Sequence, residues 1–146
     1  MDATLSVRFA DLGWPVVSPI ISAMTSHWAN HCDLLTSNGR MISAMPGGVR
    51  ERAIDSLTAK RALTVAIPCT SRQRATALAF AFEQVGKPYD YGAVLSFAWG
   101  APWSERRKWF CSELCAAALA HAGIITVPRV RRISPGDLAA MLAARS

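Results

Sequence analysis

The sequence predicts an α+β fold, with an antiparallel sheet in the first half of the chain and helices before and after it. Three observations favour this class. Short apolar runs at residues 31–35 and 40–44 flank Asn38-Gly39, and an Asn-Gly pair between such runs is a strong hairpin signal. A capping-box sequence starts at Thr70. An alanine-rich run without Gly or Pro extends from Cys111 to Ala122 and predicts a second helix.

Further strands are expected on both sides of the hairpin. Residues 5–9 and residues 62–67 alternate between apolar and other side chains, which is typical of a half-buried strand. Before the hairpin, the apolar residues 16–24 follow Pro15 and predict a short helix. After the hairpin, Pro46-Gly47-Gly48 predicts a break in the chain.

The helices have clear start and stop signals. The capping box Thr70-Ser71-Arg72-Gln73 opens a helix that ends near Gly86. Residues 87–103, rich in Gly, Pro and aromatic side chains, predict a loop. The alanine-rich helix stops at Gly123, and Ser134-Pro135-Gly136-Asp137 is expected to cap a last short helix.

The composition favours one domain over residues 1–146. The chain is 51% hydrophobic, yet no stretch approaches the roughly 18 uninterrupted apolar residues of a membrane helix. No basic segment followed by an apolar core is present at the N-terminus, so we expect no signal peptide and a cytoplasmic protein. In that compartment the four cysteines are expected to be thiols: Cys32, Cys69, Cys111 and Cys115.

The net charge of +6 allows anionic partners. The basic residues fall in short clusters and are interpreted as solvated surface. Because no nucleic-acid-binding motif accompanies them, we expect no nucleic-acid partner.

Cys111 is the candidate nucleophile. It follows Trp109-Phe110 and opens the alanine-rich helix, where unpaired N–H groups and the helix dipole favour a thiolate over a thiol. The alternative interpretation is a small buried hydrophobe at the start of a core helix. Glu113, in the first turn, is expected to complement the free N–H groups.

His31 is the candidate base. His121 lies ten residues further along the helix of Cys111, about 15 Å of rise, and so cannot reach the thiol. His31 lies in a predicted strand, and a base on a sheet can face a thiol at a helix N-terminus. A half-buried strand histidine without a catalytic role is the alternative. Asp33 on the same strand face, or Ser43 on the partner strand, could orient the imidazole, although Asp33 could equally be an exposed strand residue.

Metal binding is the rival use of these side chains. Cys111 and Cys115 are one helical turn apart, and His31-Cys32 could complete four ligands. The sequence contains no Cys-x-x-Cys knuckle, so we expect no metal and no cofactor.

The order of these motifs resembles the circularly permuted papain-like hydrolases of the NlpC superfamily, which include YiiX-like proteins and, more distantly, the lecithin:retinol acyltransferase family. The motifs are Asn30-His31-Cys32-Asp33-Leu34, Gly86-Lys87-Pro88-Tyr89-Asp90-Tyr91, Phe110-Cys111-Ser112-Glu113-Leu114 and Ser134-Pro135-Gly136-Asp137-Leu138. Histidine precedes cysteine, as in the permuted branch. Asn38-Gly39, Ile42-Ser43-Ala44 and Gly47-Gly48-Val49-Arg50 look most like small phage or prophage members.

The resemblance implies a permuted papain-like fold, with the sheet packed against a helix that bears the nucleophile at its N-terminus. It implies Cys111 as nucleophile and His31 as base, with the third polar residue falling near Ser43. Tyr89 would line the site, and Trp109, next to the Phe110-Cys111 motif, is assigned to substrate binding with it.

The first functional hypothesis is a thiol-dependent hydrolase, an amidase or peptidase that works through a Cys–His pair and an acyl-enzyme. If the resemblance to cell-wall enzymes extends to the substrate, the bond is an amide in a peptidoglycan stem peptide. A phage-associated protein would reach that polymer without an export signal.

Two alternatives remain ahead of a basic nucleic-acid-associated protein, which ranks last. One is a lipid or thioester acyl hydrolase or acyltransferase of the same fold. The other is a non-catalytic papain-like module of a phage or prophage, which would bind a peptide, lipid or virion partner with Trp99, Trp103 and Trp109 at the interface.

Overall fold

The computed structural model describes residues 1–14, 27–37, 39–93, 107–128, 130 and 133–145. The helix predicted at residues 16–24 and the 94–103 part of the predicted loop lie outside the described residues, as do Trp99 and Trp103. No helix among the described residues is long and apolar enough to cross a membrane.

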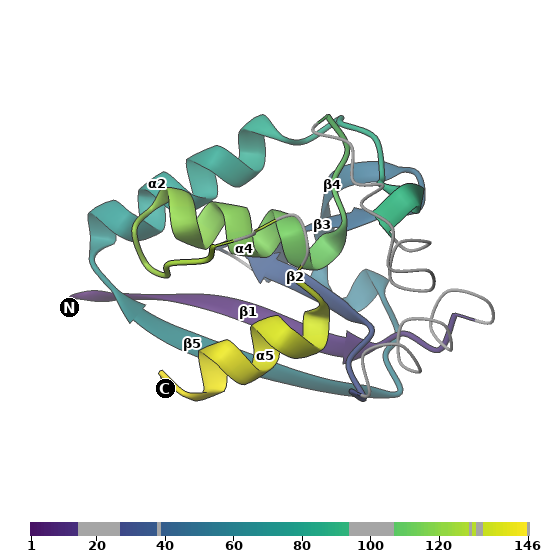
Figure 1. The fold of residues 1–146 in the computed structure, drawn as a ribbon, viewed down its shortest axis with the longest axis horizontal. Helices are drawn as coiled ribbons and strands as arrows, with labels where there is room; N and C mark the ends of the chain where they lie inside the picture. The colour runs from purple at the N-terminus through teal and green to yellow at the C-terminus, as the bar shows by residue number, and fades with distance from the viewer. Residues whose placement is uncertain (15–26, 38, 94–106, 129, 131–132, 146) are drawn as a thin grey trace.

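The fold is α+β, as predicted, and its centre is an antiparallel sheet of five strands in the order β4-β3-β2-β1-β5 (Figure 1). The two longest strands, β1 and β5, pair along their whole length. A short 3₁₀ helix, η1 (Ile54–Ser56), links β4 to β5. The strands are β1 (Ala3–Asp11), β2 (His31–Leu35), β3 (Arg40–Met45), β4 (Gly48–Ala53) and β5 (Arg61–Cys69).

The predicted hairpin is present as β2 and β3, and Gly39 adopts a left-handed φ of +70° in its turn. The break predicted at Pro46-Gly47-Gly48 is present as a tight turn, since β3 ends at Met45 and β4 begins at Gly48, which pairs with Met45. Gly47 and Gly48 have φ values of +99° and +109°, so these glycines reverse the chain within two residues. Sequence reading missed β4 because much of it is polar and does not alternate.

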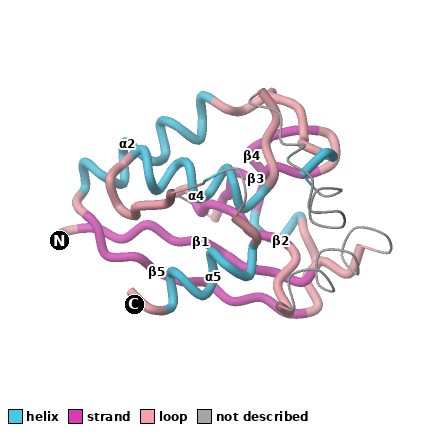
Figure 2. The backbone as a smooth tube through the Cα atoms, viewed as in Figure 1, coloured by secondary structure: helices cyan, strands magenta, loops and turns pink. Residues whose placement is uncertain are grey.

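In the part of the chain that the structure describes, three α-helices cover the sheet: α2 (Ser71–Glu83), α4 (Cys111–His121) and α5 (Pro135–Ala143) (Figure 2). α4 packs against β2, β3 and α2, while α5 lies against β5. The apolar core fills the space between helices and strands, and includes Leu5, Val7, Phe9, Leu34, Leu114, Leu119 and Leu138. This packing holds the first turn of α4 against β2, and so determines where the candidate site lies.

Candidate active site

Strand register brings the first part of the site together. β1 and β2 are antiparallel, and their pairing places Arg8 opposite Asp33 and Ala10 opposite His31. Side chains at i and i+2 of a strand point to the same face, so His31 and Asp33 lie next to one another.

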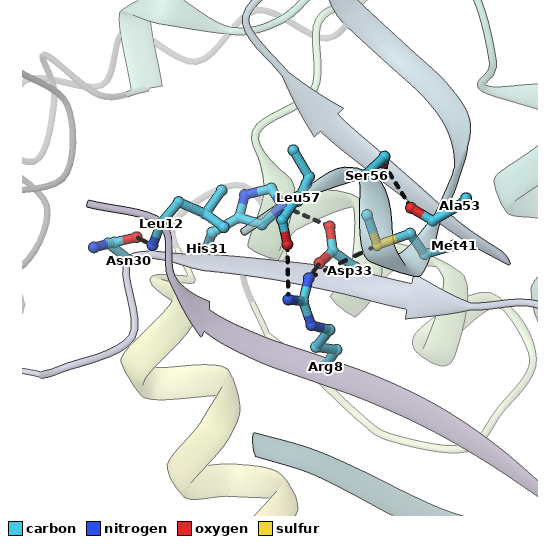
Figure 3. Close-up of polar contacts among 9 residues, drawn as sticks. All are labelled: Arg8, Leu12, Asn30, His31, Asp33, Met41, Ala53, Ser56 and Leu57. Atoms are coloured by element: carbon cyan, nitrogen blue, oxygen red, sulfur yellow. Dashed lines mark hydrogen bonds and ion pairs between the residues drawn. The ribbon is translucent and has the colours of Figure 1, made fainter. Parts of the chain in front are cut away.

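His31 and Asp33 form a short contact in the interior (Figure 3). The His31 Nε2 lies 2.5 Å from the Asp33 Oδ1. Asp33 is 0% exposed and His31 is 2% exposed, so neither is the half-buried or exposed strand residue that the alternative interpretations required. A buried carboxylate fixes the orientation of the ring and stabilises its protonated form.

Cys111 is the first residue of α4 and is 2% exposed. His31 and Cys32 lie close enough to the Cys111 thiol for both to lower its pKa. Because Nε2 of His31 faces Asp33, Nδ1 is the ring nitrogen left for the sulfur. The backbone N–H of Cys111 lies at the first helical position, where no helical carbonyl can accept it.

The environment favours a thiolate–imidazolium pair. Burial alone would raise the pKa of Cys111, but hydrogen bonds from Cys32 and His31 and the His31 charge lower this pKa to about 5. Burial alone would lower the pKa of His31, but Asp33, and then Cys111, raise it to about 10. The two groups titrate as a coupled pair, and the direction of both shifts follows from opposite charges in contact away from water.

The structure places Ser43, the second candidate for orienting the ring, beside Asp33 rather than on His31. Its buried hydroxyl has no hydrogen bond of ordinary geometry among the described residues. Burial raises the pKa of Asp33, but His31 outweighs it, and Ser43 and Arg8 add to the lowering. Of the two candidates, it is therefore Asp33 that contacts the imidazole.

Tyr89 and Trp109 lie side by side near Cys111, joined by an isolated parallel bridge. The Tyr89 ring packs 6.0 Å from that of Phe110, and burial and the nearby Cys111 charge raise the pKa of Tyr89. The Trp109 indole N–H donates to Gln84 over 3.1 Å. Trp109 is thus held in the packing around the site. Tyr89 also lines an open groove of about 470 Å³ with Gly47, Gly48, Gly86, Lys87, Pro88, Tyr91 and Lys108.

Sequence reasoning missed three neighbours of the site. Arg8 forms an ion pair with Asp33, the ring centroids of Trp14 and His31 lie 5.8 Å apart, and the Cys32 thiol is near enough to Cys111 for each to shift the pKa of the other. Burial and these sulfur contacts raise the pKa of Cys32, so it is a neutral thiol able to donate to the Cys111 sulfur. Only Arg8 carried a signal in the sequence, as a charge within an alternating strand.

All four cysteines are free. Among the described residues, no group of three or more His, Cys, Asp or Glu side chains is arranged to hold a metal ion.

A buried cysteine at a helix start, facing a histidine on an antiparallel sheet, is the arrangement of a papain-like hydrolase. The family model described as the permuted papain-like amidase enzymes, the YaeF/YiiX or C92 family, matches residues 17–141, and the chain belongs to this family. The family is described as one of permuted papain-like amidases. The narrower resemblance to the NlpC superfamily and to phage proteins remains a prediction.

A solved structure has the same fold. The crystal structure of YiiX from Escherichia coli O157:H7, which is described as a metalloprotein, superposes with a TM-score of 0.64 at 16% identity. The match covers 83% of this chain and 66% of YiiX, so the chain spans somewhat less than two thirds of that protein. No curated protein matches the sequence.

Proposed function

We propose that this protein is a thiol-dependent amidase or peptidase in which Cys111 is the nucleophile and His31 the general base and acid. The observation that carries the proposal is the buried contact of Asp33 with His31, together with the position of His31 close enough to Cys111 to lower the pKa of that thiol. Each group has the protonation state that the next one needs: an ionised carboxylate, a protonated ring and a thiolate.

The reaction follows from these positions. The Cys111 thiolate attacks the carbonyl carbon of an amide, and the developing oxyanion accepts a hydrogen bond from the backbone N–H of Cys111. His31 gives its proton to the leaving amine as the C–N bond breaks, which leaves a thioester acyl-enzyme. Water then loses a proton to His31 and attacks the thioester, which releases the acid and restores the thiolate–imidazolium pair.

We propose an amide in a peptidoglycan stem peptide as the bond that is cleaved. The amidase description of the family supports an amide over a lipid ester or thioester. The net charge of +6 supports an anionic polymer, because a basic protein raises the local concentration of such a substrate.

The pH dependence of thiol alkylation tests the Cys–His pair. Iodoacetamide labelling, assigned to each cysteine by mass spectrometry, is measured from pH 4 to pH 10 in the wild type and in His31→Ala. We expect the Cys111 rate to rise with a midpoint near pH 5 in the wild type and near the ordinary thiol value of about 8.5 in the variant. Cys115, buried one turn later on α4, is the internal control.

Two results would overturn the mechanism. A wild-type midpoint near that of an ordinary thiol would remove the activated nucleophile, and an unchanged midpoint in His31→Ala would remove the base. The non-catalytic binding module would then be the better explanation of the same fold.

A further inference from the structure

Arg8 is a buried arginine in the middle of β1. It is 8% exposed, whereas Arg and Lys are rarely buried in proteins unless they are paired. Arg40, on β3, shows the usual state, since its side chain is 46% exposed and pairs with Glu51 at the surface. A guanidinium inside the molecule has lost much of its hydration and needs specific partners.

The partners of Arg8 hold it in one orientation (Figure 3). Its Nη1 donates to the Asp33 Oδ2 over 3.2 Å and lies 4.0 Å from the Met41 sulfur. Its Nη2 donates to the Leu57 carbonyl over 3.3 Å. Two terminal nitrogens bound to two separate elements leave the planar guanidinium little freedom.

This arrangement divides the Asp33 carboxylate between two cations. Oδ2 faces Arg8 and Oδ1 faces His31. Rotation of the carboxylate would break the contact with Arg8, so Arg8 holds Oδ1 toward the imidazole. Strand register supports the same geometry, because Arg8 and Asp33 are directly opposite one another on β1 and β2.

Charge balance gives Arg8 a second effect. Arg8 and the His31 imidazolium are positive, while Asp33 and the Cys111 thiolate are negative, so the four groups sum to zero. Without Arg8 the buried cluster would carry one excess negative charge, and proton uptake by Asp33 or Cys111 would relieve it. Either route disfavours the thiolate–imidazolium pair.

We propose that Arg8 is a positioning residue of the active site, which orients Asp33 toward His31 and balances the charge of the thiolate through that carboxylate. The inference rests on the proposed function of Cys111 and His31. The competing explanation is structural: Arg8 would only tie the segment after η1 to the sheet through the Leu57 carbonyl.

The two explanations are separated by the pH at which the alkylation rate of Cys111 reaches half its maximum, measured in Arg8→Gln. If Arg8 acts on the site, the midpoint moves to higher pH by about one unit, the size expected for loss of one nearby charge at an effective dielectric constant of about 20. A purely structural role would lower the folded fraction without moving the midpoint in the folded protein. Arg40→Gln, which breaks a surface ion pair, is the matched control and should leave the midpoint unchanged.

Arg8→Lys keeps the proposal testable if Arg8→Gln fails to fold. Lysine retains the charge but lacks the planar fork that reaches two acceptors. For Arg8→Lys we expect the same midpoint of Cys111 alkylation as in the wild type. We expect His31 to accelerate the alkylation less, which is measured as the ratio of the Cys111 rate with His31 present to the rate with His31→Ala added. A wild-type midpoint together with a wild-type ratio would overturn the orienting role.

A double-mutant cycle with Asp33→Asn tests whether Arg8 works through Asp33. If it does, Arg8→Gln moves the midpoint less when it is combined with Asp33→Asn than when it is made in the wild type. Equal shifts in both backgrounds would mean a direct effect on Cys111 and would overturn the proposal.

The wild type and His31→Ala are measured in the same series. If the wild type lacks the low midpoint, or His31→Ala does not raise it, the proposed function itself is wrong. If both behave as expected and Arg8→Gln shows no shift, only the role of Arg8 is wrong.

Discussion

The helices α4 and α5 begin in opposite ways. At α5, the Ser134 Oγ accepts from the Asp137 N–H over 3.0 Å, and the Asp137 carboxylate accepts from the Ser134 N–H over 3.1 Å. At α4, the N-cap position is held by Phe110, whose side chain has no oxygen to offer. Glu113 accepts from the Phe110 N–H over 3.4 Å, but no N-cap side chain returns a hydrogen bond.

The difference shows that a helix N-terminus can either stabilise its own helix or support negative charge on neighbouring groups. A capping side chain uses up the free N–H groups of the first turn and stabilises the helix. A helix start without one keeps those groups and the positive end of the dipole available to a thiolate and to an oxyanion. α2, capped by Thr70 and Gln73, follows the pattern of α5, so α4 is the exception among the three described helices.

The largest expected effect on the cleavage rate comes from replacing the sulfur of Cys111 at the start of α4. Cys111→Ser should reduce cleavage of peptidoglycan stem-peptide amides by roughly 10⁴-fold or more, because a serine hydroxyl is not ionised by this site. Release of new amino groups from purified cell-wall sacculi measures the rate. The expected fold is unchanged, since the substitution replaces sulfur with oxygen alone.

Cys115→Ser is the control, since Cys115 is buried on the same helix one turn later. It should retain most of the activity. If both variants retained activity, Cys111 would not be the nucleophile, and the comparison of helix starts would lose its functional meaning. If the wild type released nothing from sacculi but cleaved other amides, only the peptidoglycan assignment would fail.

A smaller effect is expected from pH. The active form needs the Cys111 thiolate and the His31 imidazolium together, so kcat/KM should be highest between about pH 5 and about pH 10. Below this window the thiolate takes up a proton, and above it the imidazolium loses the proton needed by the leaving amine. The profile is measured with a small amide substrate. A single rise near pH 8.5 would instead indicate an ordinary thiol without a charged partner.

Local signals predicted much of this fold. The hairpin signal of Asn38-Gly39, the capping box at Thr70 and the cap at Ser134 each depend on residues close together in the chain, and the structure has the paired strands β2 and β3 and both helices. β4 was missed because its start depends on the left-handed conformations of Gly47 and Gly48, and because a polar strand lacks the alternating pattern.

The site was less accessible to sequence reasoning where it depends on long-range pairing. Cys111 and His31 could be proposed from a helix start and a strand. The choice of Asp33 over Ser43, however, required the contact geometry within β2 and across to β3. Arg8 could be noticed as a charge within an alternating strand, but its partner could not be predicted, since only the register of β1 against β2 places it opposite Asp33. Cys32 likewise depends on how α4 packs over the sheet.

The smallest expected effect comes from the ordinary helix starts. Ser134→Ala removes a capping hydroxyl and should lower the free energy of unfolding by about 1 kcal/mol, which corresponds to a decrease of roughly 2–4 °C in Tm. Thr70→Ala should have a similar effect at α2. Neither substitution should move the pH midpoint of Cys111 alkylation, because the two capping side chains bind N–H groups of α2 and α5, and Cys111 is on α4. Calorimetry and the labelling series measure the two quantities on the same samples.

A shift of the Cys111 alkylation midpoint in Ser134→Ala would show that α5 is coupled to the site. The coupling would run through the hydrogen bond from the Ser112 Oγ to the Ile133 carbonyl, which joins the segment before α5 to the first turn of α4. The capped start of α5 would then affect the reactivity of Cys111 at the start of α4, and the contrast between the two helix starts would not hold.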